Sequence, residues 1–303
     1  MSLARRLLNP YLRLTEKRYM ARVEDPATLR RNFEFKARLF FRAPFGTRYE
    51  RGVLGGVPVQ WARAKGVRRE AGPLVLHLHG GGYVFGSSST HRAMLGRLSA
   101  LAGLPACLPD YRLAPEHPFP AAVEDALAVY RAVEEWPGGV VIGGDSAGGG
   151  LALAVLAEVL RTGGKAPLGV FAMSPLTDMG FSGESVRTNA AADVMLPASR
   201  ATETADMYLD GADAEDPRAS PLFADFTGGP PVWLCVGDTE ILLDDTRHMA
   251  ERLAAQGVEV EMRIEHDLPH VWPYFQGLMP EAMVTLRQIA AWISSLSRSR
   301  GGS

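Results

Sequence analysis

The chain has 303 residues, of which 47% are hydrophobic and 22% are charged, so its length allows one large α/β domain with an insertion or two smaller domains. Its formal net charge of -2 at pH 7 gives no electrostatic reason to expect a nucleic-acid partner. The two cysteines, Cys107 and Cys235, lie in apolar runs and are expected to be inert core thiols, so neither a disulfide framework nor a metal site is predicted.

The first 45 residues mix basic side chains with Leu, Tyr and Phe, which predicts one or two amphipathic helices. We assign them to a cap whose apolar faces pack on the main domain, with association of their basic face with a membrane surface as the alternative. The N-terminus has no uninterrupted apolar segment of the roughly 7–15 residues that a signal peptide requires, and no apolar run in the chain approaches the roughly 18 residues of a membrane span. We therefore expect a cytoplasmic protein.

Strands and helices alternate along most of the remaining chain. A Gly-Gly pair at residues 55–56 predicts a hairpin between two short alternating runs. Short apolar runs predict further strands at 74–79, 106–108, 140–142, 168–173, 232–236 and 258–264. Apolar positions at helical spacing predict helices at 95–102, 121–135, 151–160, 244–256 and 282–296. This alternation predicts an α/β fold.

The alternation breaks between residues 175 and 221, which are rich in Asp, Gly, Ser and Thr. We expect this segment to be a cap insertion between two parts of the core, 46–174 and 222–297, and we expect a disordered tail at 298–303. Six large side chains, five of them in or beside this insertion, are assigned to the wall of an apolar substrate pocket, although packing within the cap would also explain those five. They are Tyr83, Phe181, Met195, Met207, Tyr208 and Phe223.

A glycine run follows the strand at residues 74–79. Gly80, Gly81 and Gly82 offer backbone N–H groups that no side chain covers, which suits the binding of an oxyanion. A flexible loop is the simpler explanation for such a run when it stands alone. A downstream nucleophile favours the oxyanion hole, because lipases and esterases carry an HGGG loop at this point in the chain order.

The candidate nucleophile is Ser146. It lies in Gly144-Asp145-Ser146-Ala147-Gly148, between a β-branched run and an Ala-rich run, and this G-x-S-x-G pattern is typical of a nucleophile elbow. A dinucleotide-binding fingerprint would need glycine at Asp145, and a phosphate-binding loop would need a Gly-Lys pair. Both of these alternatives are excluded.

A serine nucleophile needs a histidine base, and the α/β-hydrolase chain order of nucleophile, acid and histidine leaves His266 and His270 after the last strand. We select His270 because Val271 and Trp272 could shield it from solvent.

The acid must come from the loop after residues 232–236. Asp244 and Asp245 are explained by the start of the following helix, where carboxylates are favourable. Asp238 and Glu240 remain, and their spacing does not separate them.

The motifs His79–Gly82, Asp110–Glu116 and Gly144–Gly149 together resemble those of the bacterial hormone-sensitive-lipase-like esterases, family IV. Residues 216–222 and 238–245 match as well. The resemblance implies an α/β-hydrolase core: a mostly parallel central sheet of about eight strands, with helices on both faces and a helical cap. It also implies hydrolysis of short- to medium-chain carboxylic esters with no metal and no organic cofactor.

Carried onto this sequence, the resemblance makes Ser146 the nucleophile and His270 the base. It places the oxyanion hole at the N–H groups of Gly81, Gly82 and Ala147. Many members have an aspartate four residues before a second aspartate, whereas Glu240 holds that position before Asp244 here. We therefore expect the branch that uses glutamate, with Glu240 as the acid and Asp244 as the alternative.

The expected partner is a small-molecule ester, and a homodimer is the family-level expectation. Two other functions remain open: a catalytically silent small-ligand receptor on the same fold, and an amidase. An intact set of Ser146, His270 and Glu240 argues against the receptor.

Overall fold

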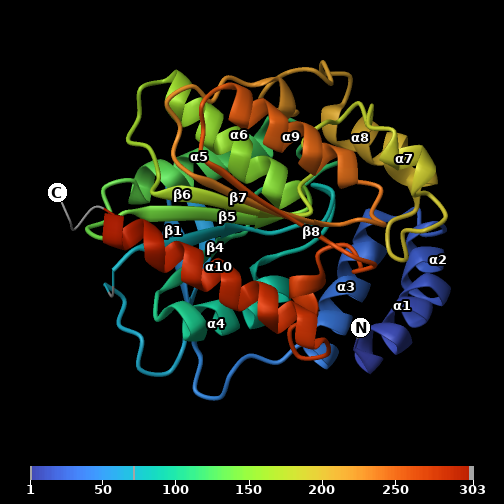
Figure 1. Cartoon of the computed structure of the whole chain (residues 1–303), viewed down its shortest axis with the longest axis horizontal. Coiled ribbons are helices and arrows are strands. Elements are labelled where there is room, and N and C mark those ends of the chain that lie inside the picture. Colours follow the sequence, from blue (N-terminus) through green and yellow to red (C-terminus); the bar gives the residue numbers. More distant parts are fainter. Residues whose placement is uncertain (1, 71, 300–303) are drawn as a thin grey trace.

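The computed structural model describes residues 2–70 and 72–299 of the chain. Within them, eight strands form one sheet in the order β1-β2-β4-β3-β5-β6-β7-β8 (Figure 1). The strands are β1 (Arg48–Leu54), β2 (Val57–Arg63), β3 (Leu74–Leu78), β4 (Ala106–Pro109), β5 (Val140–Asp145), β6 (Gly169–Met173), β7 (Val232–Gly237) and β8 (Val260–Glu265). Only the pairs β1–β2 and β2–β4 are antiparallel, so the prediction of a mostly parallel sheet is confirmed.

Helices cover both faces of the sheet, as Figure 1 shows, with α5, α6 and α9 on one side and α4 and α10 on the other. The helices of the core are α4 (Ser88–Ala102), α5 (Ala121–Val133), α6 (Ala147–Arg161), α9 (Leu243–Ala255) and α10 (Pro280–Ser299). Along β5, Val140 and Ile142 pack into the α5–α6 side, and Val141 packs into the α4–α10 side. Because both faces of β5 are buried, residues 140–142 are apolar at consecutive rather than alternate positions.

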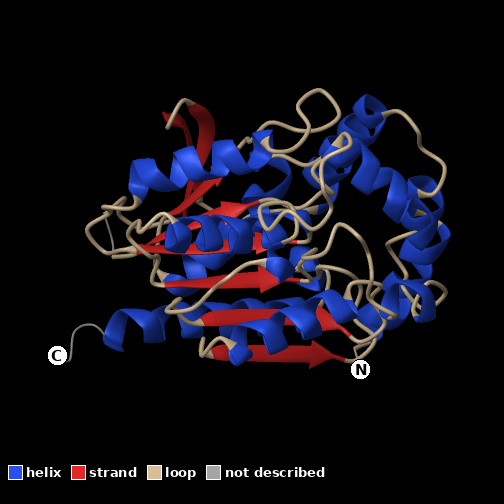
Figure 2. Ribbon diagram, turned by 90° about the horizontal axis from the view of Figure 1, so that it is seen from above, coloured by secondary structure: helices blue, strands red, loops and turns tan. Residues whose placement is uncertain are grey.

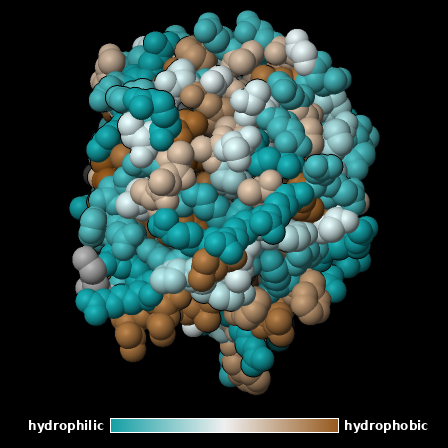
Figure 3. Space-filling view, turned by 90° about the vertical axis from the view of Figure 1, so that its right-hand side faces the viewer, coloured by the Kyte–Doolittle hydropathy of each residue, from teal (hydrophilic) through white to brown (hydrophobic). Residues whose placement is uncertain are grey.

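Two segments that are distant in sequence lie together at one end of the sheet, and we call them the cap. The N-terminal segment contains α1 (Leu3–Leu14), α2 (Glu16–Met20) and α3 (Pro26–Phe40), and the insertion contains α7 (Ser185–Thr188) and α8 (Ala201–Leu209). Figure 1 shows both at the right of the molecule, and Figure 3 shows that side in space-filling form. In Figure 2 the parallel strands point toward them, so the cap lies at the carboxyl edge of the sheet.

Hydrogen bonds join the two cap segments. Arg13 donates to the carbonyl oxygens of Ala191 and Ala192 at 2.6 and 2.9 Å, and Lys17 donates to those of Ala190 and Asp193 at 2.7 and 2.6 Å. The basic side chains of α1 and α2 thus bind backbone carbonyls of the insertion.

Several elements differ in extent from the prediction, among them α6, which starts at Ala147 rather than 151. The N-terminal segment forms three helices rather than one or two, because Asp25 caps a separate helix by accepting hydrogen bonds from the amides of Ala27 and Thr28. Helix α4 starts at Ser88 rather than at 95. A capping box of Ser87 and Thr90 begins the helix, and the polar side chains of its first turn are buried.

Helix α10 continues through Ser299, so it includes residues 298 and 299 of the predicted tail. Residues 300–303 lie outside the described part of the chain. No helix in residues 2–70 and 72–299 combines the length and the apolar composition needed to cross a bilayer.

Candidate active site

Ser146 occupies a sharp turn between β5 and α6. Its backbone has φ 52° and ψ −126°, an unusual conformation for a residue with a side chain. A Cβ atom added to Gly144 would lie 2.0 Å from the carbonyl oxygen of Gly148, and one added to Gly148 would lie 2.1 Å from that of Leu78. Glycine is therefore required on both sides of the serine, and the predicted strand-to-helix turn is present.

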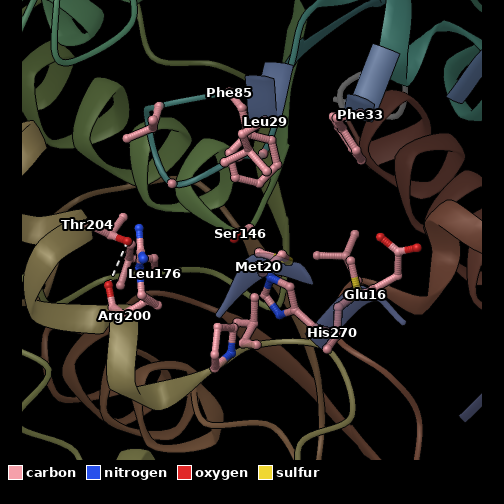
Figure 4. Close-up of a pocket in the computed structure, with 18 of the residues that line it drawn as sticks. Glu16, Met20, Leu29, Phe33, Phe85, Ser146, Leu176, Arg200, Thr204 and His270 are labelled. Atoms are coloured by element: carbon pink, nitrogen blue, oxygen red, sulfur yellow. Dashed lines mark hydrogen bonds between the residues drawn. The ribbon is translucent and has the colours of Figure 1, made fainter. Parts of the chain in front are cut away.

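The Ser146 side chain faces a pocket with a cavity volume of about 180 Å³ (Figure 4). Loops at the carboxyl edge of the sheet form one part of its wall, and the cap segments form the rest. Residues that line it include Met20, Leu29, Phe33, Gly81, Gly82, Phe85, Leu176, Met195, Leu196, Arg200, Thr204, Met207 and His270. Within the described residues, the Ser146 hydroxyl has no hydrogen-bond partner, so it is free to meet a bound molecule.

The glycine loop lies beside the serine and is fixed from three directions. Gly81, with φ 130°, accepts hydrogen bonds through its carbonyl oxygen from the amides of Val84 and Phe85, each at 3.0 Å. The Tyr111 hydroxyl donates to the His79 carbonyl at 2.6 Å, and the Gly80 amide donates to Asp145 Oδ2 at 3.1 Å.

Three backbone N–H groups are left free at this point. Those of Gly81, Gly82 and Ala147 have no partner among residues 2–70 and 72–299, as an oxyanion hole requires.

Asp145, the residue before the serine, is the centre of a buried polar cluster that sequence reasoning missed. Its carboxylate contacts His77 Nε2 at 2.9 Å and His91 Nε2 at 3.1 Å. Burial alone would raise the pKa of Asp145, but the attraction of His91 and the hydrogen bonds with both histidines outweigh burial and hold that pKa below its usual range. The only sequence signal was an acidic residue inside an otherwise small and apolar elbow.

The structure pairs Glu240 with His270. Glu240 Oε2 lies 2.6 Å from His270 Nδ1, and both side chains are buried. Burial lowers the pKa of His270, but the Glu240 carboxylate raises it by charge and by hydrogen bonding, and the net shift is upward. Because Nδ1 is bonded to the carboxylate, Nε2 is left for the pocket that also holds Ser146.

The other candidate acids have different partners. Asp238 accepts from the exposed His266, with 2.7 Å between Oδ2 and Nδ1, and from the amide of Asp267 at 2.8 Å. Asp244 accepts from the amide of Ser185 at 2.7 Å. The structure therefore separates Asp238 from Glu240, which spacing in the sequence left open, and gives Asp244 no contact with His270.

Ser174, directly after β6, is a second residue that the sequence analysis missed. Its hydroxyl donates to Glu240 Oε1 at 2.8 Å and accepts from the amide of Val271 at 3.1 Å. The Gly237 amide also donates to Glu240 Oε1, at 2.6 Å. Its position could have indicated this role, because Ser174 and Glu240 follow β6 and β7, and residues that follow adjacent parallel strands meet at one edge of the sheet.

The cap insertion also holds the loop that carries Glu240. The Asn189 side-chain amide donates to the carbonyl oxygens of Asp238 and Glu240 at 3.1 and 2.8 Å. The buried Asp193 carboxylate accepts from the amide of Ile241 at 3.0 Å. No pattern in the sequence connected residues 189 and 193 with this loop.

Three of the six side chains that were expected in the pocket wall line the pocket. Met195, Met207 and Phe181 line the pocket. Tyr83, Tyr208 and Phe223 are absent from its wall, which corrects the expectation for these three residues.

The two tyrosines instead stack on each other in the core, with their ring centroids 3.8 Å apart. The positive φ of Tyr83, 62°, accompanies this core position. Phe223 is in a short 3₁₀ turn and is partly exposed to solvent.

Comparisons with known proteins agree with this fold and pocket. Residues 75–274 match a family model described as "alpha/beta hydrolase fold". The chain is 36% identical over 244 residues to an acetyl-hydrolase of Streptomyces hygroscopicus, covering 80% of this chain and 81% of that protein. It is 35% identical over 251 residues to an esterase of Acinetobacter venetianus, covering 79% and 83%.

Solved structures are similar over almost the whole chain. A crystal structure of EstE5 soaked with ethyl alcohol has a TM-score of 0.91 and 36% identity, covering 98% of this chain and 100% of that one. A crystal structure of an esterase from the bacterial hormone-sensitive lipase family also has a TM-score of 0.91 and 36% identity, and it covers 98% of both chains. The chain therefore belongs to the hormone-sensitive-lipase-like, family IV esterases of the α/β-hydrolase fold and is a serine carboxylic ester hydrolase.

Proposed function

We propose that the protein hydrolyses short- to medium-chain carboxylic esters through Ser146, His270 and Glu240. The observation that carries the proposal is the 2.6 Å contact between Glu240 and His270, beside a pocket that also contains Ser146 and the glycine loop. A serine hydroxyl is a poor nucleophile at neutral pH, and this arrangement supplies the base and the carboxylate that orients the base.

In the acylation step, Ser146 Oγ attacks the ester carbonyl carbon while His270 Nε2 takes the hydroxyl proton. The Glu240 carboxylate stabilises the imidazolium that forms. The N–H groups of Gly81, Gly82 and Ala147 donate to the negative carbonyl oxygen of the tetrahedral intermediate. The bond between the carbonyl carbon and the alkoxy oxygen then breaks, and the alcohol leaves with the proton that His270 returns.

Deacylation repeats the same steps with water. His270 takes a proton from a water molecule, whose oxygen attacks the acyl carbon bound to Ser146. The bond between that carbon and Ser146 Oγ breaks, the proton returns to the serine, and the carboxylic acid is released.

The pocket supports small acyl groups. Its volume of about 180 Å³ lies below the roughly 300–1,000 Å³ of typical sites for drug-sized ligands, and its wall includes methionine, leucine, phenylalanine, valine and isoleucine side chains. Each methylene that fits gains roughly 0.8 kcal/mol, until the chain meets the end of the pocket. Relatives named acetyl-hydrolase agree with a preference for small acyl groups.

The test is hydrolysis of p-nitrophenyl esters of increasing acyl length, starting from acetate and butyrate. One similar structure, EstE5, was soaked with p-nitrophenyl butyrate, which makes this ester a suitable first substrate. We expect release of nitrophenol by the wild type and a loss of kcat on the order of a millionfold in Ser146→Ala. Ser99→Ala, which removes a buried serine hydroxyl that is bonded to the Leu104 carbonyl, is the matched control.

Two results would contradict the proposal. Ser146→Ala with near wild-type activity would exclude Ser146 as the nucleophile. Wild-type protein that binds esters but neither releases nitrophenol nor reacts with a serine-directed phosphonate would favour a silent ligand receptor.

A further inference from the structure

Helix α1 exposes an apolar stripe to solvent. Leu3, Leu7, Tyr11 and Leu14 recur at intervals of three and four residues, and they are 71, 68, 46 and 56% exposed. Such spacing places all four side chains on one side of the helix. In a globular protein this stripe normally faces the core, so its outward position needs an explanation.

Polar contacts fix α1 in this orientation. On the opposite side of the helix, the buried Arg5 donates to the His266 carbonyl at 2.7 Å, and the buried Asn9 donates to the Asp267 carbonyl at 3.1 Å. The side of α1 that packs on the protein carries these two polar side chains beside the buried Leu12, and the apolar stripe cannot turn inward without breaking the two hydrogen bonds.

Helix α3 and the loop after it add to the apolar surface. Phe35, Leu39 and Phe40 are 67, 56 and 45% exposed, and Phe45 is 95% exposed. We call these four residues, together with the α1 stripe, the N-terminal apolar face. In Figure 3, hydrophobic side chains gather along the lower edge of the side that carries the cap.

The same segment is strongly basic. Residues 1–45 contain 11 Lys and Arg against 4 Asp and Glu, a formal charge of +7, although the whole chain carries -2, so that residues 46–303 carry -9. Arg6, Arg18, Arg22 and Arg42 are exposed and form no ion pair within residues 2–70 and 72–299. Helix α1 itself contains no carboxylate.

We propose that the N-terminal apolar face docks on the surface of an anionic lipid bilayer. Exposed Leu and Phe side chains would enter the boundary between headgroups and acyl chains, and the unpaired arginines would bind lipid phosphates. The positive charge selects this partner, because a second copy of the chain would bring two segments of charge +7 together. Met20 and Phe33, on α2 and α3, line the active-site pocket, so docking brings lipid next to the helices that enclose it.

The test measures binding, so it does not depend on the proposed catalytic role. Full-length Ser146→Ala protein is centrifuged with sucrose-loaded vesicles of phosphatidylcholine alone or of phosphatidylcholine with phosphatidylglycerol. We expect the protein to pellet with the vesicles that contain phosphatidylglycerol and to be released as the salt concentration rises, because salt screens the arginines.

Matched variants test the two components of the face. Leu7→Ser should weaken binding to anionic vesicles by about tenfold, whereas Val53→Ser, which removes a 66% exposed side chain from the β1–β2 hairpin, should have no effect. Arg6→Gln with Arg18→Gln should weaken binding by about tenfold or more. Arg51→Gln with Arg68→Gln, an exposed and unpaired set among the described residues, should not.

Three results would overturn the proposal. One is failure of the protein to pellet with anionic vesicles, and another is equal pelleting with both vesicle types at every salt concentration. The third is a dimer in the absence of lipid that Leu7→Ser, but not Val53→Ser, converts to a monomer, because the face would then be a contact between two copies. Unchanged melting temperatures would show that the variants are folded.

Discussion

The hydroxyl of Ser174 donates a hydrogen bond of 2.8 Å to Oε1 of Glu240, 66 residues further along the chain. Oε2 of the same carboxylate lies 2.6 Å from His270. The two oxygens of one buried group therefore have separate partners, and the serine fixes the rotation of the carboxylate that orients the histidine. In the proposed mechanism, Ser174 therefore has the role of a positioning residue that acts through Glu240.

We predict that Ser174→Ala lowers kcat by roughly 10- to 100-fold and leaves the KM for a short ester nearly unchanged. A hydrogen bond to a charged group contributes about 1.5–3 kcal/mol, and its loss would let the carboxylate rotate. Ser99→Ala removes another buried hydroxyl, which accepts from the amide of Ala64 at 3.0 Å and does not line the pocket. Steady-state kinetics should show the loss of kcat only in Ser174→Ala, and equal losses in both variants would refute the positioning role.

The Glu240–His270 pair predicts the dependence of activity on pH. Only neutral His270 can accept the serine proton, and its pKa is raised above 6.5, so kcat/KM should fall as the pH decreases through a value above 6.5. In Glu240→Gln the charge that raises this pKa is removed while burial still lowers it. The acid limb should therefore move to lower pH, with a loss of kcat on the order of 10⁴.

Asp238→Asn is the control for this pH profile. It removes a similar carboxylate from the exposed His266, and the midpoint of the acid limb should stay at the wild-type value. A midpoint that moves in Asp238→Asn and not in Glu240→Gln would reverse the assignment of the acid.

The hydrogen bonds from Asn189 to the loop that carries Glu240 predict that Asn189 supports catalysis. Asn189→Asp has almost the same size and shape but lacks the amide that donates to the Asp238 and Glu240 carbonyls. We expect kcat to fall by about tenfold, because the loop that carries Glu240 loses its attachment to the cap. Kinetics with p-nitrophenyl acetate would measure this, and a fall in melting temperature with unchanged kcat would limit Asn189 to a structural role.

Asp245 predicts a dependence of stability on pH. Burial raises the pKa of Asp245 from 3.8 to about 7, although it accepts hydrogen bonds from the amides of Thr177 and Asp178 at 2.8 and 3.1 Å. A raised folded-state pKa means that the stabilisation is present below about pH 4 and is lost as the pH rises toward 7.

Asp245→Asn should remove this dependence, because its side-chain oxygen can accept the same hydrogen bonds without ionising. Relative to the wild type, its free energy of unfolding should increase by an amount on the order of 4 kcal/mol between pH 4 and pH 8. Urea unfolding at several pH values would measure this difference, and a constant difference would show that Asp245 has an ordinary pKa.

The fold was predictable from the sequence because its strongest signals are local. The apolar run at 140–142, the small residues after it and the Ala-rich helix predict the elbow without any long-range information. Helix α4 was predicted too short because its first turn buries Ser88, Thr90 and His91, and buried polar residues do not show as an apolar pattern.

The partners of the acid could not be predicted in the same way. Asp238 and Glu240 are only two residues apart in one loop. Their positions in the sequence therefore do not show that Asp238 contacts His266 and that Glu240 contacts His270. Tyr83 was likewise expected in the pocket wall but lies in the core. Its stacking with Tyr208 depends on a contact between segments 125 residues apart in number, which no local pattern reports.

The contacts at Gly144 and Gly148 have a consequence for laboratory evolution of this protein. A library that randomises the elbow should return almost only glycine at both positions, since even alanine would collide with the main chain. Altered acyl selectivity must then come from other residues of the cavity wall, among them the side chains of α8 and the N-terminal helices that line the cavity. Variants with new selectivity can thus be sought by changing residues of the cavity wall while the sequence of the elbow is kept.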